Sequence, residues 1–215
     1  MKLTDLHNHT TFSYDGKNSP EEIIKNAIKN NIDVLGICDH QYSLGSDLSK
    51  YIYTLKELKY KYKNLIDLKI GLEIGTRPNP SDFLLSFTKE LDYCLFECLD
   101  SDFSMDFYEF LQWVSLFKIP VGLAHTDIFY LSEKYNEDIL KIMKDYNIFW
   151  EINASGNYNY YYDFITNKEK QQIIKNSKIF VSIGSDTHLI NDFKISKIKS
   201  LHSLIENLGN PIIFS

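Results

Sequence analysis

The chain has 215 residues, of which 44% are hydrophobic and 24% are charged, and its formal net charge is −6. These values predict one globular domain over residues 1–215, and the acidic balance disfavours a surface for long nucleic acids. The cysteines Cys38, Cys94 and Cys98 show no C-x-x-C spacing, which excludes a disulfide framework and fits a reducing compartment. No stretch resembles a signal peptide or a membrane span. We therefore expect a cytoplasmic protein without membrane attachment, and the oligomeric state stays open.

Short apolar runs alternate with longer amphipathic segments along the chain. The apolar runs predict strands at residues 2–7, 33–38, 68–74, 91–97, 120–125, 148–153 and 178–184. Apolar residues at helical spacing predict helices at 19–31, 79–91, 105–117, 132–146 and 166–177. The first of these opens with Ser19, Pro20 and two glutamates, which are signals of a helix start.

This order of strands and helices predicts an α/β fold with a parallel sheet. The βα repeats run without an internal linker, which favours a sheet closed into a barrel, and an open doubly wound sheet is the alternative. One biased loop, residues 155–167, follows the sixth strand and carries Tyr158, Tyr160, Tyr161 and Tyr162. A packed tyrosine cluster and a substrate lid are equally good interpretations of this loop.

Side chains that bind metals stand at the carboxyl end of every predicted strand. In chain order they are His7 and His9, Asp39 and His40, Glu73, Glu97, His125 and Asp127, Glu151 and Asn153, and Asp186 and His188. Five of the six histidines share this position. In a barrel the strand ends converge on one face, where active sites lie. The pattern therefore predicts a metal site, and its mixture of imidazole and carboxylate suits Zn, Mn or Fe.

Five stretches resemble motifs of the polymerase and histidinol phosphatase (PHP) family of metal-dependent phosphoesterases. They are DLHNHTTFSYDGKNSPEEIIKNAIKNNIDVLGICDH, GLEIG, GLAHTD, WEINASG and IGSDTH, and they cover most of the chain in the family's order. The resemblance implies a distorted (β/α)7 barrel with the active site at the C-terminal ends of the strands. It also implies two to three divalent metal ions.

The resemblance implies a ligand set for each ion. The first ion would be held by His7, His9, Glu73 and Asp186. Glu73 would bridge to a second ion, which also uses His125, and the third would be held by Asp15, His40 and His188.

One position departs from the histidinol-phosphatase-like branch, whose members have a histidine near the place of Leu99. This chain has Glu97 at the strand end instead, which is similar to the bacterial tyrosine-phosphatase branch. We take Glu97 as a ligand of the second metal. Asp5, Asp39 and Asp127 are expected to orient ligand histidines, and for Asp5 a solvent-facing or capping role is an equally good interpretation.

The function expected from this resemblance is hydrolysis of a small phosphate monoester, histidinol phosphate or another metabolite, by a metal-bridging hydroxide. His188 or a metal-bound water would protonate the leaving oxygen, beside the ligand Asp186. Arg77 is the only arginine, and it either grips the phosphate or is a surface residue. His202, outside every motif, is expected to face solvent.

Two alternatives remain open. One is a phosphodiesterase or nuclease that acts on short oligonucleotides, whose bases could stack on the tyrosine loop. The other is a metal-binding regulatory module without hydrolytic activity. The sequence does not identify the alcohol half of the substrate, the metal, or the number of ions bound.

Overall fold

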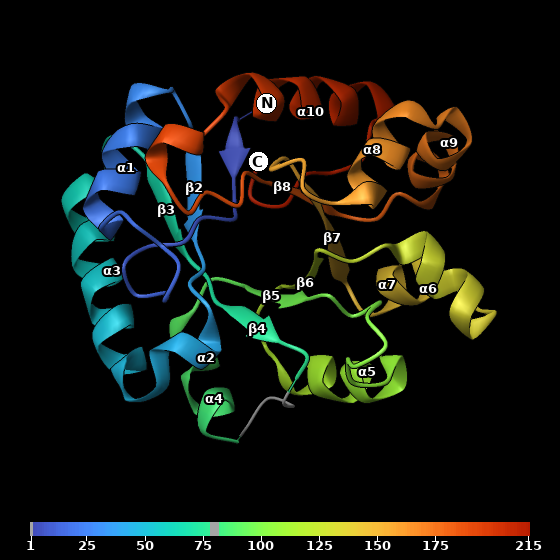
Figure 1. Ribbon diagram of the computed structural model, residues 1–215, viewed down its shortest axis with the longest axis horizontal. Helices are drawn as coiled ribbons and strands as arrows, with labels where there is room; N and C mark the ends of the chain where they lie inside the picture. Colours follow the sequence, from blue (N-terminus) through green and yellow to red (C-terminus); the bar gives the residue numbers. More distant parts are fainter. Residues whose placement is uncertain (1, 78–81) are drawn as a thin grey trace.

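The computed structural model describes residues 2–77 and 82–215 (Figure 1). In these residues the strands form two sheets, and all of their pairings are parallel. The first sheet holds, in this order, β1 (Thr4–Asp5), β2 (Val34–Ile37) and β3 (Asp67–Ile70). The second holds, in chain order, β4 (Glu73–Gly75), β5 (Cys94–Glu97), β6 (Val121–Ala124), β7 (Ile148–Asn153) and β8 (Val181–Gly184). The predicted α/β fold with parallel strands is confirmed.

The predicted third strand, 68–74, is interrupted and supplies both β3 and β4. At the break, a Cβ on Gly71 would lie 2.3 Å from Cζ of the buried Tyr93 ring. Only glycine admits this approach of the ring to the backbone. The two sheets stay in contact there, because the Glu73 backbone N–H donates to the Asp39 carbonyl at 3.2 Å.

Backbone hydrogen bonds also join the first strand to the last. The Leu6 N–H donates to the Ile183 carbonyl at 2.8 Å, and the Asp186 N–H donates to the His7 carbonyl at 2.8 Å. The carboxyl ends of β1 and β8 therefore lie next to each other, although their residues are almost 180 positions apart in the sequence.

Helices surround the sheets in Figure 1, with α1 and α3 beside β2 and β3 and with α10 beside β1 and β8. Their bounds are α1 (Pro20–Lys29), α2 (Gln41–Leu44), α3 (Leu48–Tyr62), α4 (Asp82–Phe87), α5 (Phe107–Leu116), α6 (Ile128–Tyr135), α7 (Ile139–Asp145), α8 (Asn159–Thr166), α9 (Lys168–Ser177) and α10 (Ile195–Leu208). Apolar side chains of these helices pack on the strands and form the core.

The first predicted helix is confirmed as α1. Its N-terminus is a capping box: the Ser19 side chain accepts from the Glu22 backbone N–H, and Glu22 accepts in return from the Ser19 N–H. The predicted helices 105–117 and 166–177 correspond to α5 and α9. Residues 79–81 of the predicted helix 79–91 lie outside the described residues, and the remainder contains α4.

Three local predictions were wrong. The segment 132–146 holds the end of α6 and all of α7, because Asn136 takes a left-handed conformation with φ 51° that ends α6. The biased loop 155–167 contains α8, and α3 was not predicted at all. His202 does not face solvent: it is 5% exposed, and its Nε2 lies 3.0 Å from the Thr4 backbone nitrogen.

No helix in the described part of the chain is long and apolar enough to cross a membrane.

Candidate metal centre

The segments that follow the strands bring all the predicted metal ligands into one cluster. Glu73, predicted at the carboxyl end of a strand, stands instead at the start of β4, after the break that follows β3. His7 and His9 follow β1, His40 follows β2, and His125 follows β6. The donor atoms form groups whose members lie within 4.8 Å of one another. The groups are His9 with Asp15, His40 and His188; His7 with His9 and Asp186; His40 with Glu73 and Glu97; and His7 with His125 and Glu151.

Glu73, at the start of β4, is the central carboxylate of the cluster. Its Oε1 lies 3.2 Å from His7 Nε2 and 3.1 Å from His125 Nε2. Its Oε2 lies 3.4 Å from His9 Nε2 and 2.7 Å from His40 Nδ1. The side chain is fully buried. Burial raises the pKa of Glu73, but the surrounding histidines, His7 first, outweigh it and hold that pKa well below its ordinary value.

Asp186 closes the side of the cluster formed by β1 and β8. Its Oδ1 lies 3.4 Å from His9 Nε2 and its Oδ2 lies 3.8 Å from His125 Nε2. Asp186 and His125 both have left-handed backbones, with φ 55° and 51°. This conformation is uncommon outside glycine and is often found where a functional site holds it. At both positions it turns the chain directly after a strand, so that the side chain meets the cluster.

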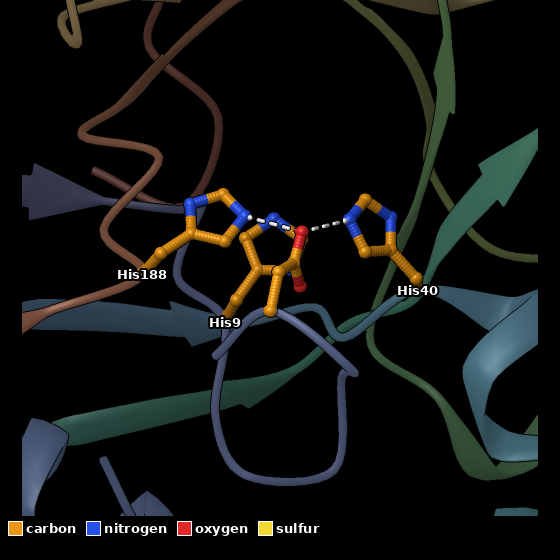
Figure 2. Close-up of side chains that lie close together, drawn as sticks. His9, His40 and His188 are labelled. Carbon is orange, nitrogen blue, oxygen red and sulfur yellow. Dashed lines mark ion pairs between the residues drawn. The ribbon is translucent and has the colours of Figure 1, made fainter. Parts of the chain in front are cut away.

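Asp15 lies between two histidines that approach from opposite sides (Figure 2). Its Oδ2 is 3.2 Å from His188 Nε2 and 3.3 Å from His40 Nε2. The ring of His9 stacks on that of His188, with 4.2 Å between centroids. Three imidazoles and one carboxylate therefore converge on one point at the outer end of the cluster.

The donor set fits divalent cations. Several buried polar atoms of the cluster make no well-directed hydrogen bond within the described residues, although ring nitrogens lie as close as 2.7 Å to some of them: Asp15 Oδ1, His40 Nδ1, Glu73 Oε1, Glu73 Oε2 and Asp186 Oδ1. Burying carboxylate oxygens without a partner costs several kcal/mol unless a cation compensates them. The separations of 3.1 to 3.4 Å between Glu73 and the nitrogens of His125, His7 and His9 match the edges, about 3.0–3.4 Å, of a coordination polyhedron with ~2.1 Å bonds. The 2.7 Å contact between Glu73 Oε2 and His40 Nδ1 has the length of a hydrogen bond.

Asp39 and Asp5 do not touch ligand histidines among the described residues, which corrects the prediction. Asp39 accepts from the backbone N–H groups of Thr10 at 2.6 Å and Ser13 at 3.0 Å, so it holds the loop between His9 and Asp15. Asp5 accepts from the backbone N–H and the hydroxyl of Ser185, both at 2.8 Å, and so holds the segment that leads to Asp186. Both aspartates therefore hold backbone segments that lead to residues of the cluster.

Asp127 has a different role from the predicted one. Its carboxylate accepts from the backbone N–H groups of Phe129 at 2.9 Å and Tyr130 at 3.1 Å. It is therefore the N-cap of α6.

Two side chains of β7 contact histidines of the cluster. In the sequence they stand among the polar groups at the strand ends, and no individual role was predicted for them. Glu151 Oε1 lies 2.5 Å from His7 Nδ1, and Asn153 Nδ2 lies 3.1 Å from His125 Nδ1. Residues 151 and 153 share one face of the strand, so their polar character at i and i+2 in "WEIN" was the available signal.

A cavity of about 480 Å³ opens beside the cluster. Its walls include Arg77, Glu97, Asp100, His125 and Tyr158. The Arg77 guanidinium donates to the Ser101 hydroxyl and lies 4.3 Å from the centroid of the Phe103 ring. Burial, and then the charge of Glu73, raises the pKa of Glu97 above its ordinary value. The one arginine of the chain thus lies on the same cavity as two carboxylates and a cluster histidine.

The tyrosines at 157–162 were interpreted as either a packed cluster or a substrate lid, and the structure separates them. Tyr160 and Tyr161 are buried in the core from α8, and Tyr162 is exposed. Tyr158 stacks on His125, with 4.3 Å between centroids and 20° between the rings. The packing interpretation is confirmed for Tyr160 and Tyr161, and a lid stays a prediction that concerns Tyr158.

The sequence model of the PHP domain matches residues 5–112. A histidinol-phosphatase from Lactococcus lactis subsp. lactis (strain IL1403) is 32% identical over 81 residues, which are 35% of this chain and 30% of that protein.

Two solved structures resemble the whole fold. One is histidinol phosphate phosphatase from Lactococcus lactis subsp. lactis Il1403, complexed with zinc, L-histidinol and phosphate; its TM-score is 0.68 at 17% identity, and the match covers 98% of this chain and 95% of that one. The other is a structure described as histidinol phosphatase from Listeria monocytogenes, with a TM-score of 0.64 at 20% identity, covering 88% and 97%. At these identities the likeness is one of fold.

Proposed function

We propose, from the premise that the chain belongs to the PHP domain family, that it is a metal-dependent phosphoesterase that hydrolyses a small phosphate monoester. Histidinol phosphate is the first substrate to test, because the similar Lactococcus structure holds zinc, L-histidinol and phosphate. The Lactococcus sequence match spans less than a third of that relative. The support for the activity is therefore the geometry of the site together with membership of the family.

One observation carries the proposal: carboxylate oxygens of Glu73, Asp186 and Asp15 are buried without a well-directed hydrogen bond in the described part of the chain, although histidines surround them. We assign three metal positions. The first uses His7, His9, Glu73 and Asp186; the second uses Glu73, Glu97 and His125; and the third uses Asp15, His40 and His188. Zn, Mn and Fe all suit this mixture of ligands.

Divalent ions in these positions would lower the pKa of bound water, supply a bridging hydroxide and offset charge on the phosphate. The protein's own groups would complete the site. Arg77 lies on the adjoining cavity and has the planar geometry to bind a phosphate through two hydrogen bonds. The His188 side chain is 33% exposed, the highest value among the cluster histidines, so it is the histidine best placed to exchange a proton with a leaving alcohol.

We also propose that the two sheets are parts of one distorted seven-stranded barrel, in which β3 and β4 count as one interrupted strand. The hydrogen bonds from Leu6 to Ile183 and from Glu73 to Asp39 support this arrangement. It places every ligand on the face where barrel enzymes carry their active sites.

The test is phosphate release by manganese-reconstituted protein from L-histidinol phosphate, p-nitrophenyl phosphate and bis-p-nitrophenyl phosphate. Asp186→Asn removes a proposed ligand charge, and Asp192→Asn, at an exposed aspartate nearby, is its matched control. We expect turnover of one or both monoesters that chelator and Asp186→Asn abolish and Asp192→Asn retains. Hydrolysis of the diester alone, or metal binding without turnover of any of the three, would overturn the monoesterase proposal.

A further inference from the structure

We infer that Glu151 is a positioning residue that couples the first and second metal positions, by orienting His7 directly and His125 together with Asn153. The inference rests on the proposed function for the identity of these positions. It concerns a side chain that belongs to neither proposed ligand set, and it is carried by contacts among buried groups.

The rings of His7 and His125 lie between two glutamates. The Nε2 atoms of both rings face the same oxygen of Glu73, at 3.2 and 3.1 Å. Their Nδ1 atoms both face Glu151: His7 Nδ1 lies 2.5 Å from Oε1, and His125 Nδ1 lies 3.9 Å from Oε2. One carboxylate therefore sits on the metal side of both rings and the other sits on their far side.

The contact between His7 and Glu151 has the length of a hydrogen bond. At 2.5 Å it is shorter than the edges, about 3.0–3.4 Å, that separate two ligands of one ion. Glu151 is thus a hydrogen-bond acceptor for His7 and not its fellow ligand. A carboxylate at Nδ1 favours the tautomer that has the proton on this atom, which leaves the Nε2 lone pair free for a metal.

Asn153 links the same carboxylate to His125. Its Oδ1 accepts from the Ser155 backbone N–H at 2.9 Å. Its Nδ2 lies 3.4 Å from Glu151 Oε2 and 3.1 Å from His125 Nδ1. A metal at His125 Nε2 would place the ring proton on Nδ1, and the Asn153 amide would then turn its Oδ1 toward the ring to accept that proton. His125 is held on its other side by the stacked ring of Tyr158. The position of the His125 ring therefore depends on Asn153, and that of Asn153 depends partly on Glu151.

The backbone of β8 leaves room for this carboxylate. A Cβ on Gly184 would lie 2.3 Å from Glu151 Oε1 and 2.4 Å from the Cβ of His7. The absence of a side chain at residue 184 lets Glu151 reach His7 under β8. The Glu151 carboxylate is thus confined to one place, which is what orienting a ligand requires.

The experiment compares zinc binding by Glu151→Gln, Glu151→Leu and Asn153→Leu with binding by the wild-type protein. Gln171→Leu is the matched control, because Gln171 is also buried, 4% exposed, and donates two 3.0 Å hydrogen bonds to backbone carbonyls in the region of α8 and α9. Chelator competition gives the dissociation constant of each bound zinc, and circular dichroism reports on folding. In the zinc-loaded proteins, ¹H–¹⁵N NMR detects the far-downfield proton expected on His7 Nδ1.

We expect Glu151→Leu to weaken two zinc equivalents by about 10- to 100-fold and to remove the far-downfield proton. Asn153→Leu should weaken only one equivalent and keep that proton. Glu151→Gln retains an acceptor and the side-chain size, so it should keep the fold and show a loss near the lower end of this range.

Two results would overturn the inference. If Glu151→Gln and Glu151→Leu bind zinc as Gln171→Leu does, Glu151 is merely structural. If a Glu151 variant lacks one equivalent even at saturating zinc, Glu151 is a ligand. Failure of the wild-type protein to bind zinc would count against the proposed metal centre itself. None of these results depends on a phosphatase assay, so they are independent of the proposed activity.

Discussion

At the scale of single residues, the site is built from polar side chains buried directly after the strands. His9 is buried among other ionisable groups: its Nε2 lies 3.0 Å from His7 Nε2 and 3.4 Å from oxygens of both Glu73 and Asp186. Two ring nitrogens at this distance either share a proton or bind one cation. The orphaned oxygens of Glu73 and Asp186 nearby favour the cation.

His9→Ala should therefore remove bound metal and lower phosphate release by about 100-fold or more, because a catalytic metal contributes several kcal/mol. The fold should survive, since the core does not depend on this ring. Metal analysis by mass spectrometry and a thermal unfolding curve measure the two effects. Thr11→Ala, at an exposed residue of the same loop, is the control, and turnover retained by His9→Ala would refute its role as a ligand.

Glu97 has a narrower role. Its carboxylate comes within 4.8 Å of donor atoms of His40 and Glu73, and it lines the same cavity as His125, the other ligand that we propose for the second metal. Glu97→Ala should weaken one metal equivalent and leave the others unchanged, as measured by metal titration. Asp100→Ala removes another carboxylate of the same cavity and should change none of them. Unchanged metal content in Glu97→Ala would assign Glu97 to the cavity wall and leave the second metal with fewer ligands.

At the scale of elements, β7 and β8 are matched to each other across the cluster. Asn153 pairs with Gly184 in the register of the two strands, and the bare backbone of Gly184 admits the side chain of Glu151. A glycine in a strand normally weakens the strand. Gly184 is instead the position at which the buried carboxylate of Glu151 packs directly against the strand backbone.

Gly184→Ala should lower the free energy of unfolding of the metal-free protein by about 1–3 kcal/mol, the usual effect of overpacking. Metal affinity should fall with it, since the added Cβ displaces Glu151 or His7. Urea unfolding followed by circular dichroism measures the first effect. Gly75→Ala is the control, because a Cβ there would meet its nearest atom at an ordinary 3.5 Å; equal destabilisation of both variants would argue against the clash.

At the scale of the whole molecule, the two ends of the chain are joined under the site. His202, on α10, contacts Thr4 in β1 across 198 residues. Burial lowers the pKa of His202 below its ordinary value of 6.5. The folded protein thus favours the neutral ring, whose Nε2 can accept from the Thr4 N–H.

A lowered pKa means that the unfolded chain binds the proton more readily, so this group's contribution to stability is present above its unfolded pKa and is lost as the pH falls below it. We expect the wild-type protein to lose more unfolding free energy than His202→Gln between about pH 7.5 and pH 5.5. Urea unfolding of the two proteins at both pH values measures the difference, in which the other histidines cancel. Equal losses would show that His202 takes up no additional proton on unfolding.

The elements were predictable where local signals are strong. The capping residues of α1 and the apolar runs of β2, β5 and β6 report on short-range physics, and they were confirmed. The break between β3 and β4 was not predictable, because the ring of Tyr93 that packs against Gly71 there comes from the residue before β5, more than 20 positions away. His202 was misassigned for a similar reason, since its partner lies at the opposite end of the chain.

The sequence by itself determined the α/β class, the family resemblance and which side chains stand at the strand ends, because strand periodicity and the order of the motifs are local properties of the chain. Only the tertiary structure decided that Asp39 and Asp5 hold loops, that Asp127 caps a helix, and that Glu151 and Asn153 contact the histidines. These roles depend on which strands become neighbours and on how closely their backbones approach, and long-range packing fixes both.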